Sequence, residues 1–376
     1  MHKNLKVVHL SSVHPRNDIR IFEKECVSLV NNGFNVTLLV ADGLGESVYQ
    51  GVRVIDVGKP ITRIHRMIYT VINIKRTALR LGADIYHLHD PELLLIVKYL
   101  KRNGFTVIYD AHEDVAKQII SKPYLNPIIA RIISIIFARF EKKIIKYLDC
   151  IIAATPSIAE KFKSLHNHIV IVNNYPLQRE TYGLISREKE GSCIAYIGAI
   201  SKIRGLKFVV QALSILEGKV KLHIAGTFIE NDYYKELSIM DGWKYVIDHG
   251  QVSRDEVSEI LGKSIAGIVT FLPVPNHVNS QPNKIFEYMA SAIPVIASDF
   301  PLWKRIIKNT NSGICVNPES PTDIASAIEW ILMHPDEALN LGENGRRAIE
   351  RQYNWGIEEK SLIEEYKKLA GYITPR

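Results

Sequence analysis

The chain has 376 residues, 47% of them hydrophobic and 23% charged, which predicts a globular protein with two domains. Its four cysteines form no Cys-x-x-Cys pair, which argues against a disulfide framework or a cysteine-rich metal site. No apolar run reaches the about 20 residues that span a bilayer, and the first ten residues do not resemble a signal peptide. We therefore expect a cytoplasmic protein.

The net charge of +7 is unevenly distributed. Residues 1–173 contain 24 Lys and Arg against 15 Asp and Glu, which gives +9; the rest contain 23 against 25, which gives −2. The positive half predicts an acidic partner, such as a membrane surface or a phosphorylated acceptor. No nucleic acid is expected, because no nucleic-acid-binding motif accompanies the charge.

Short apolar runs alternate with helical periodicity along the chain, which predicts parallel sheets with crossover helices. In the first half, strands are expected at 5–10, 36–40, 52–57, 85–88, 106–110, 150–154 and 169–172, and helices at 19–31, 91–101 and 126–148. In the second half, strands are expected at 193–198, 221–226, 245–249, 267–271, 294–297 and 313–316, with helices beginning near residues 204, 254, 283, 302 and 322.

The stretch 174–192 shows neither the apolar run of a strand nor the periodicity of a helix, and it contains a mixed-charge run, so we predict a linker there. The fold class is therefore α/β, with two Rossmann-like doubly wound domains, 1–173 and 193–355, facing across a cleft. Residues 356–376 are expected to form a charged amphipathic helix. Ligands of such sheets bind at the carboxyl ends of the strands.

The segment 282–290 has the pattern of an anion and hydroxyl site. Its polar start, with Asn283 and Lys284, opens an apparent helix, and a lone carboxylate, Glu287, follows one turn later. A helix start offers free N–H groups to an anion, here with a lysine beside them. The carboxylate can accept hydrogen bonds from two sugar hydroxyls, so the segment predicts a sugar-nucleotide site.

The segment 196–207 reads as a strand, a loop beginning at Gly198, and a helix start. Arg204 and Lys207 lie in it, and with the backbone amides they could stabilise a diphosphate leaving group. The alternative is an ordinary turn whose cations face solvent.

Polar residues also follow two strands of the first half. His14, Arg16 and Asp18 are predicted to contact acceptor or donor phosphate, although Asp18 could instead cap a helix. His112 comes just after the strand that ends at Asp110; it is either a site residue or a hydrogen-bonded structural histidine. No Asp-x-Asp pair and no metal-ligand spacing is present, so no metal is expected.

Together these motifs resemble the retaining glycosyltransferases of family 4, which have the GT-B fold. The resemblance covers essentially the whole chain, is strongest over 193–301, and is similar to the bacterial cell-surface polysaccharide branch (O-antigen or exopolysaccharide synthesis). It rests on Gly198…Arg204-Gly205, His249-Gly250-Gln251-Val252, Pro282-Asn283-Lys284…Phe286-Glu287, Pro294–Ser298, Asp18-Ile19-Arg20 and Tyr109–Glu113. It implies a C-terminal helix that crosses back to the N-terminal domain.

The resemblance implies an acceptor-side domain at 1–173 and a nucleotide-sugar-binding domain at 193–355. The implied catalytic residues are His112 at the transferred sugar and Arg204 and Lys284 at the diphosphate. The implied donor-binding residues are Gly198, Lys207, Val252 at the base, Asn279, Asn283, Phe286 and Glu287 at the ribose. His14, Arg16 and Asp18 are assigned to the acceptor side.

Two positions depart from the family pattern. Asn279 stands where the family often has a second glutamate, and Ala199 replaces an arginine. The expected activity is metal-independent transfer of a sugar from a nucleoside-diphosphate sugar to a growing, lipid-linked surface glycan, with no cofactor. The alternatives are a sugar-nucleotide epimerase of the same fold and a non-catalytic sugar-nucleotide-binding partner protein.

The segment 126–148 combines an apolar stripe with a basic flank, a pattern of helices lying in a membrane interface. The alternative is a core-packed helix with a solvated face. Residues 59–83 carry six Lys and Arg and no acidic residue, with apolar residues between them. We therefore hypothesise that the N-terminal domain docks peripherally on an anionic membrane at the inner face of the cell membrane.

Overall fold

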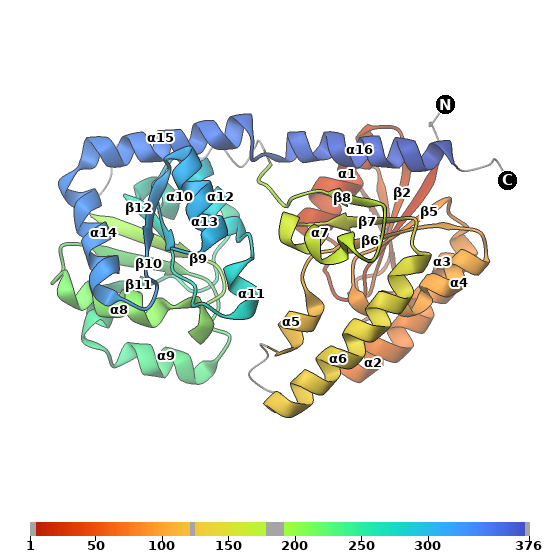
Figure 1. Ribbon diagram of the computed structural model, residues 1–376, viewed down its shortest axis with the longest axis horizontal. Coiled ribbons are helices and arrows are strands. Elements are labelled where there is room, and N and C mark those ends of the chain that lie inside the picture. The colour runs from red at the N-terminus through yellow and green to blue at the C-terminus, as the bar shows by residue number, and fades with distance from the viewer. Residues whose placement is uncertain (1–4, 121–124, 178–191, 373–376) are drawn as a thin grey trace. The chain divides into compact units, whose positions relative to one another are not determined.

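The computed structural model describes residues 5–120, 125–177 and 192–372. The chain forms two compact units: unit 1 contains Met1–Asn174 and Trp355–Arg376, and unit 2 contains Tyr175–Asn354. Each is an α/β unit built on one sheet (Figure 1). Most of the predicted linker, with its mixed-charge run, lies outside the described residues.

Unit 1 has an eight-stranded sheet in the order β3-β4-β2-β1-β5-β6-β7-β8. Its strands are β1 (Lys6–Leu10), β2 (Asn35–Val40), β3 (Ser47–Tyr49), β4 (Val52–Asp56), β5 (Ile85–Leu88), β6 (Thr106–Ala111), β7 (Cys150–Ala153) and β8 (Ile169–Ile171). All neighbours pair in parallel except β3 and β4. The strand order reverses between β1 and β5, the position where doubly wound sheets bind ligands.

The helices of unit 1 connect these strands, and the C-terminal helix completes the unit. They are η1 (Ile19–Cys26), α1 (Val27–Asn31), α2 (Arg63–His65), η2 (Arg66–Thr70), α3 (Val71–Leu81), η3 (Pro91–Ile96), α4 (Val97–Arg102), α5 (Val115–Ile120), α6 (Pro127–Ile144), η4 (Ile145–Tyr147), α7 (Pro156–Lys163) and α16 (Trp355–Gly371). The segments η1 and η2 are wide, π-helical turns that run directly into α1 and α3.

Unit 2 has a six-stranded, fully parallel sheet in the order β11-β10-β9-β12-β13-β14. Its strands are β9 (Cys193–Ile197), β10 (Lys221–Ala225), β11 (Val246–Asp248), β12 (Ala266–Val269), β13 (Val295–Ser298) and β14 (Gly313–Val316). Its helices are η6 (Lys202–Arg204), α8 (Leu206–Ile215), α9 (Asn231–Ser238), η7 (Asp241–Tyr245), α10 (Arg254–Lys263), α11 (Pro275–Val278), α12 (Asn283–Ala290), α13 (Pro301–Thr310), α14 (Pro321–Met333) and α15 (Pro335–Arg351). Here the strand order reverses at β9.

The central strands are buried on both faces, which is why they are continuous apolar runs in the sequence. On β9, Ile194 and Tyr196 pack into a core with α8 and α14, whereas Ala195 and Ile197 pack into a second core with α12 and α13. Helices therefore cover both faces of the sheet, as the alternating pattern predicts.

In unit 1 the two faces of the sheet differ in chemistry. Val8 and Tyr86 face an apolar core, but their neighbours His9 and His87 point to the opposite face, which η1 and α16 cover. Because β1 and β5 pair with His9 opposite His87, the two imidazoles lie side by side. A polar network is thereby built into the buried sheet.

The predicted fold class is confirmed: both units are doubly wound α/β sheets, and α16 packs on η1, α1 and β8 of unit 1. The Trp355 indole donates to the Ser28 hydroxyl at 2.9 Å at the start of this helix. Predicted strand limits agree within two residues, but β3 was missed because it is a short antiparallel edge strand. The helix expected over 126–148 gives way to a 3₁₀ turn after Ile144.

Candidate functional site

In unit 2, the loops that follow β9 and β10 approach each other closely, and the side chain of Lys284 lies against the first of them. Gly198 has a φ of +99°, and a Cβ there would lie 2.8 Å from the Lys284 ammonium. A Cβ on Gly226 would lie 2.2 Å from the carbonyl oxygen of Gly198. Glycine at both positions therefore allows Lys284, from the first turn of α12, to lie over the carboxyl end of β9.

Lys284 is a cation held in an apolar surrounding. Its ammonium lies 5.6 Å from the ring centre of Tyr196 and 5.7 Å from that of Phe271. Burial and the like charge of Arg204 lower its pKa to about 8, against the opposing effect of Glu287. Among the described residues no carboxylate pairs with this ammonium, so an anionic ligand could do so.

Arg204 is held in the same place by the loop before α8. One guanidinium nitrogen donates to the Ala199 carbonyl at 2.7 Å, and the guanidinium carbon lies 5.3 Å from the Phe271 ring centre. Gly205 follows with a φ of +75°, and a Cβ there would lie 2.0 Å from the Thr270 carbonyl oxygen. The loop can approach β12 only because this residue is glycine.

Glu287 lies one turn after Lys284 on α12, with 29% of its side chain exposed. The nearest cation is Arg254 at the start of α10, whose guanidinium is 3.7 Å from a carboxylate oxygen. Phe286 does not reach the site surface: it is 1% exposed and packs edge-on against Tyr175. The structure places its side chain in the core beneath α12, and its donor contact stays a prediction.

The other predicted donor residues are less closely grouped. The Lys207 ammonium is paired with Glu236 of α9 at 3.0 Å, so the structure gives it a surface ion pair instead of a place beside Lys284. Val252 is half-buried before α10, Asn283 is exposed at the first residue of α12, and Asn279 is exposed at the end of α11. The structure brings together Gly198, Arg204, Lys284 and Glu287 around the carboxyl ends of β9 and β12.

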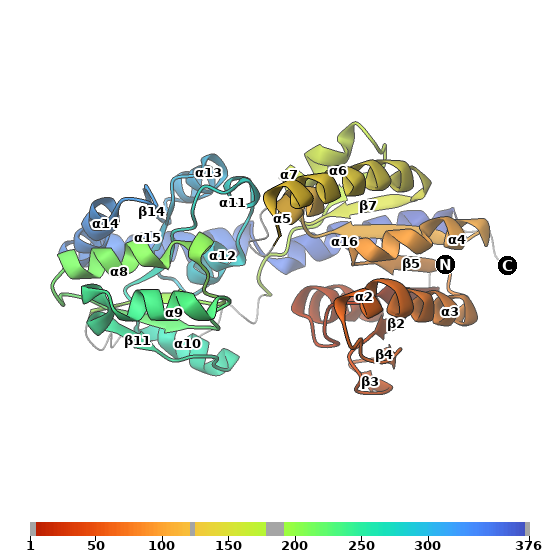
Figure 2. The same cartoon turned by 90° about the horizontal axis from the view of Figure 1, so that it is seen from below.

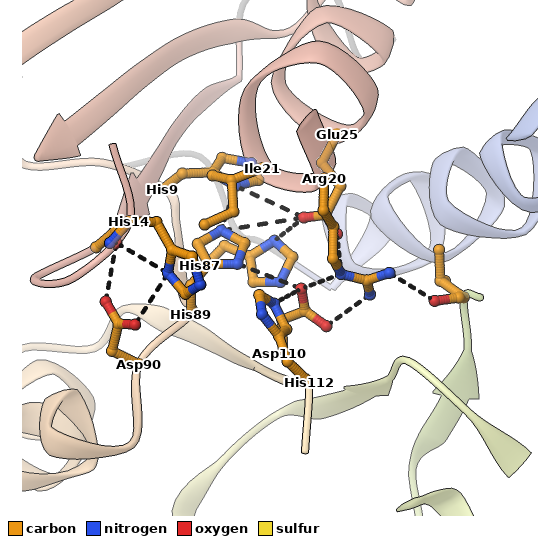
Figure 3. A network of polar contacts seen from close by, with 12 residues as sticks. His9, His14, Arg20, Ile21, Glu25, His87, His89, Asp90, Asp110 and His112 are labelled. Atoms are coloured by element: carbon orange, nitrogen blue, oxygen red, sulfur yellow. Dashed lines mark hydrogen bonds and ion pairs between the residues drawn. The ribbon is translucent and has the colours of Figure 1, made fainter. Parts of the chain in front are cut away.

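In unit 1, His112 belongs to a network centred on one buried carboxylate (Figure 3). Its Nε2 lies 2.6 Å from Asp110 Oδ2, and Arg20 donates to both oxygens of Asp110 at 2.9 and 2.8 Å. Burial raises the pKa of Asp110, but Arg20 and His112 outweigh this effect and hold the pKa well below its usual range. His112 is 20% exposed, so it is anchored on one side and open on the other.

His14 has a similar arrangement at the end of β1. Its Nδ1 lies 3.0 Å from Asp90, and its ring centre is 5.4 Å from that of His112. Burial lowers the pKa of His14, but the hydrogen bond and charge of Asp90 outweigh it and raise the pKa. Asp90 also accepts from the Ser12 amide at 2.6 Å and the Ser11 hydroxyl at 2.8 Å. His14 and His112 are thus brought together across the switch point of this sheet.

The structure gives two of the acceptor-side residues partners within unit 1. Arg16 donates to both oxygens of Asp42 at 2.7 and 2.8 Å and to the Gly45 carbonyl, so it holds the loop after β2. Asp18 accepts from the Ile21 amide at 2.9 Å and caps η1, which was the alternative reading of this residue. Of the three acceptor-side residues, His14 alone lies beside His112.

The sequence did not predict the polar residues beneath His112. His9, His87, His89 and Glu25 are buried on the face covered by η1 and α16 (Figure 3). Burial lowers the pKa of all three imidazoles and, with the charge of Asp110, raises the pKa of Glu25. The signal that could have found them is His87-x-His89 in a strand, since residues two apart face the same side.

Two family descriptions match the sequence: Glycosyl transferases group 1 over residues 183–348 and Glycosyltransferase Family 4 over residues 25–174. The relatives include spore coat protein SA of Bacillus subtilis, 22% identical over 57% of this chain and 60% of that protein. The D-rhamnosyltransferase WbpZ of Pseudomonas aeruginosa is 22% identical over 70% of this chain and 68% of that protein.

Solved structures share the fold at low sequence identity. Sucrose-phosphate synthase from Thermosynechococcus elongatus superimposes with a TM-score of 0.81 at 16% identity, covering 98% of this chain and 99% of that one. HepE from Anabaena in complex with UDP gives 0.74 at 14% identity, covering 97% and 100%. Another HepE structure was solved with UDP-glucose.

Proposed function

Because the chain carries a glycosyltransferase group 1 domain and a family 4 domain on a GT-B fold, we propose that it is a retaining glycosyltransferase. It transfers a sugar from a nucleoside-diphosphate sugar to a growing, lipid-linked surface glycan. The observation that carries the proposal is Lys284, a half-buried ammonium without a carboxylate partner among the described residues, beside Arg204 and the start of α12. Relatives named as sugar transferases, and HepE with UDP-glucose, support the donor class.

In this mechanism the departing diphosphate is stabilised by positive charge that is already in place. Arg204, Lys284 and the amide groups at the start of α12 supply that charge, so the reaction needs no metal. Glu287 accepts hydrogen bonds from the ribose hydroxyls. The acceptor attacks the face from which the diphosphate leaves, and the diphosphate helps to remove the acceptor proton, which gives retention. His112, anchored by Asp110, contacts the transferred sugar.

A thermal-shift panel of UDP-, GDP-, ADP- and CDP-sugars identifies the donor, and the anomeric configuration of the product, read by NMR, tests retention. Lys284→Ala is expected to abolish the shift by the donor, whereas Lys304→Ala, an exposed lysine on α13, keeps it. Inversion at the anomeric carbon contradicts the retaining mechanism. An epimer formed from donor alone indicates the epimerase instead, and binding without turnover indicates a partner protein.

We also propose that unit 1 docks on an anionic membrane to reach the lipid-linked acceptor. The first half of α6 exposes Ile128 (71%), Ile132 (52%) and Ile136 (61%), which lie four residues apart on one face. Beyond that half, Phe137, Phe140 and Ile144 pack on the core, as the alternative of a core-packed helix expects for this part of the segment. Arg131 and Arg139 are exposed beside the isoleucines.

The second segment of this surface is the start of the helix that follows β4. Ile64 (71% exposed) and Ile68 (50%) lie on α2 and η2, next to exposed Arg63. Both α2 and α6 lie at the lower edge of unit 1 in Figure 1, the side toward the viewer in Figure 2. Apolar side chains flanked by cations match an anionic lipid surface. Within the described residues, no helix is both long and apolar enough to cross a bilayer.

Flotation with liposomes tests this surface. The protein is expected to float with vesicles that contain acidic lipid and much less with neutral ones, and Ile132→Ser with Ile136→Ser should reduce the floating fraction. Ile239→Ser, at an 84%-exposed position in unit 2, is the matched control. Equal and negligible binding to both kinds of vesicle contradicts the proposal.

A further inference from the structure

Four potential metal ligands converge at the centre of unit 1 (Figure 3). They are His9 from β1, His87 from β5, His89 just after β5, and Glu25 from η1, and all are buried. Residues 78 positions apart along the chain meet because β1 and β5 pair in register, with His9 opposite His87. Sequence spacing could not show this grouping, because the pairing of β1 with β5 brings His9 and His87 together.

The distances between the ligand atoms are close to those of a tetrahedral site. One oxygen of Glu25 lies 3.9 Å from His9 Nδ1, 3.8 Å from His87 Nδ1 and 4.0 Å from His89 Nε2. His9 Nδ1 and His89 Nε2 are 2.9 Å apart. A tetrahedral zinc with bonds of about 2.0–2.2 Å has ligand atoms about 3.3–3.6 Å apart. The four distances bracket that range.

The second nitrogen of two of these histidines already has a partner. His89 Nδ1 lies 3.3 Å from Asp110, and His9 Nε2 lies 3.4 Å from the Tyr366 hydroxyl. Such outer contacts fix the tautomer of metal-bound histidines and leave the inner nitrogen free to coordinate. His89 Nε2 and His9 Nδ1 therefore face each other; they share a hydrogen bond at 2.9 Å, which an ion between them would replace. The Tyr366 hydroxyl also lies 2.7 Å from His87 Nδ1, so an ion bound at that nitrogen would replace this hydrogen bond.

The carboxylate of Glu25 lacks hydrogen bonds that its burial would require. Among the described residues, neither of its oxygens accepts one, although Arg20 Nε lies 3.2 Å from one oxygen. The N–H groups of Arg20 donate instead to Asp110 and to the Val172 carbonyl. Arg20 pairs with Asp110 as well as with Glu25, so a second cation among the imidazoles would further compensate this fully buried carboxylate.

We propose that His9, His87, His89 and Glu25 bind one Zn²⁺ ion. Three imidazoles and one carboxylate suit zinc, whereas Mg²⁺ and Ca²⁺ prefer oxygen ligands. The site is closed to solvent, so the ion is structural and joins β1, β5 and η1. It takes no part in the proposed sugar transfer, and its test does not depend on that function.

The test measures metal in the full chain, purified without a polyhistidine tag. After passage over a chelating resin, mass spectrometry of the metal content should find close to one zinc per chain. His87→Gln should lose most of it. His223→Gln is the control, because His223 and His249 form a histidine pair in unit 2, 3.0 Å apart, outside the cluster. Zinc retained equally by His87→Gln and the unchanged protein overturns the proposal.

If His87→Gln does not fold, a second measurement on the unchanged protein tests the site. The unchanged protein is unfolded in the presence of a chelator, which removes bound metal, and is then refolded with Co²⁺. The visible absorption of Co²⁺ reports the geometry of its coordination. Bands of tetrahedral Co²⁺ that Zn²⁺ removes support the site. Refolded protein that binds neither ion overturns it.

Discussion

Glu287 and Phe286 are neighbours on α12 with opposite environments. Glu287 is partly exposed beside Lys284, whereas Phe286 is buried against Tyr175. The local pattern predicted that this helix carries a site but not which side chains face it. The direction in which each residue points depends on how α12 packs on the sheet, and that is a tertiary property.

We predict that Glu287→Ala lowers kcat/KM about 10- to 150-fold, because hydrogen bonds to a charged group contribute about 1.5–3 kcal/mol. The midpoint of thermal unfolding should stay near that of the unchanged protein, since the side chain makes only one long ion pair with Arg254. Glu259→Ala, an exposed carboxylate on α10, serves as the control. Full activity of Glu287→Ala contradicts the ribose assignment.

Lys284 predicts a pH dependence of donor binding. Its pKa is about 8, so the ammonium is charged below that pH and neutral above it. Donor affinity should therefore fall as pH rises through 8, by at most about tenfold per pH unit. Isothermal titration calorimetry between pH 7 and pH 10 measures this. Lys284→Met should bind weakly and without this dependence; an unchanged slope in that variant refutes the assignment.

The same lowered pKa has the opposite effect on stability. The unfolded chain holds this proton up to the ordinary pKa of 10.5, and the folded chain releases it near 8. Between these values the unfolded state binds more protons, so the Lys284 contribution to folding stability rises with pH. Opposite trends in affinity and stability would identify Lys284 as their common source.

At the scale of elements, the loop between β9 and α8 depends on two close backbone approaches. We predict that Gly205→Ala destabilises the protein more than Gly250→Ala does, by about 1–3 kcal/mol. Both residues have a positive φ, +75° and +63°, so both substitutions cost about 1–2 kcal/mol of backbone strain. Only at Gly205 does a Cβ meet another atom, the Thr270 carbonyl.

Urea unfolding of the two variants measures the difference. Equal stability losses would mean that the loop moves away from β12 at little cost. In that case the placement of Arg204 does not rely on this contact.

The sequence predicted the central strands and the main helices better than the edge strand or the transitions between helix types. Central strands such as β9 and β12 are apolar throughout, so they were found within two residues. The edge strand β3 has no clear period of its own and was missed, and the helix predicted over 19–31 begins as the π-helical turn η1 before it becomes α1. The convergence of His9, His87 and Asp110 was not predicted either, since only the register of β1, β5 and β6 brings them together.

At the scale of the whole molecule, the two units are built from the chain in different ways. Unit 2 is one continuous segment, whereas unit 1 needs α16 from the far end of the chain. We predict that Leu362→Ala, at a fully buried position of α16, lowers the free energy of unfolding by about 2–5 kcal/mol.

Hydrogen exchange locates this effect. Faster exchange should appear in unit 1, at β8 and η1, with unit 2 unchanged, because α16 packs on those elements. Glu364→Ala, an exposed position on the same helix, should have no such effect. Equal exchange in both variants would show that α16 is not an integral part of unit 1.

This discontinuity has a consequence for biosynthesis. On the ribosome, unit 2 has all of its residues as soon as Asn354 emerges, but the sheet of unit 1 still lacks its cover from Trp355 onward. Until α16 arrives, the buried face with His9 and His87 lacks the contact with Tyr366. The half of the protein that is translated first is therefore the half whose folding is completed last.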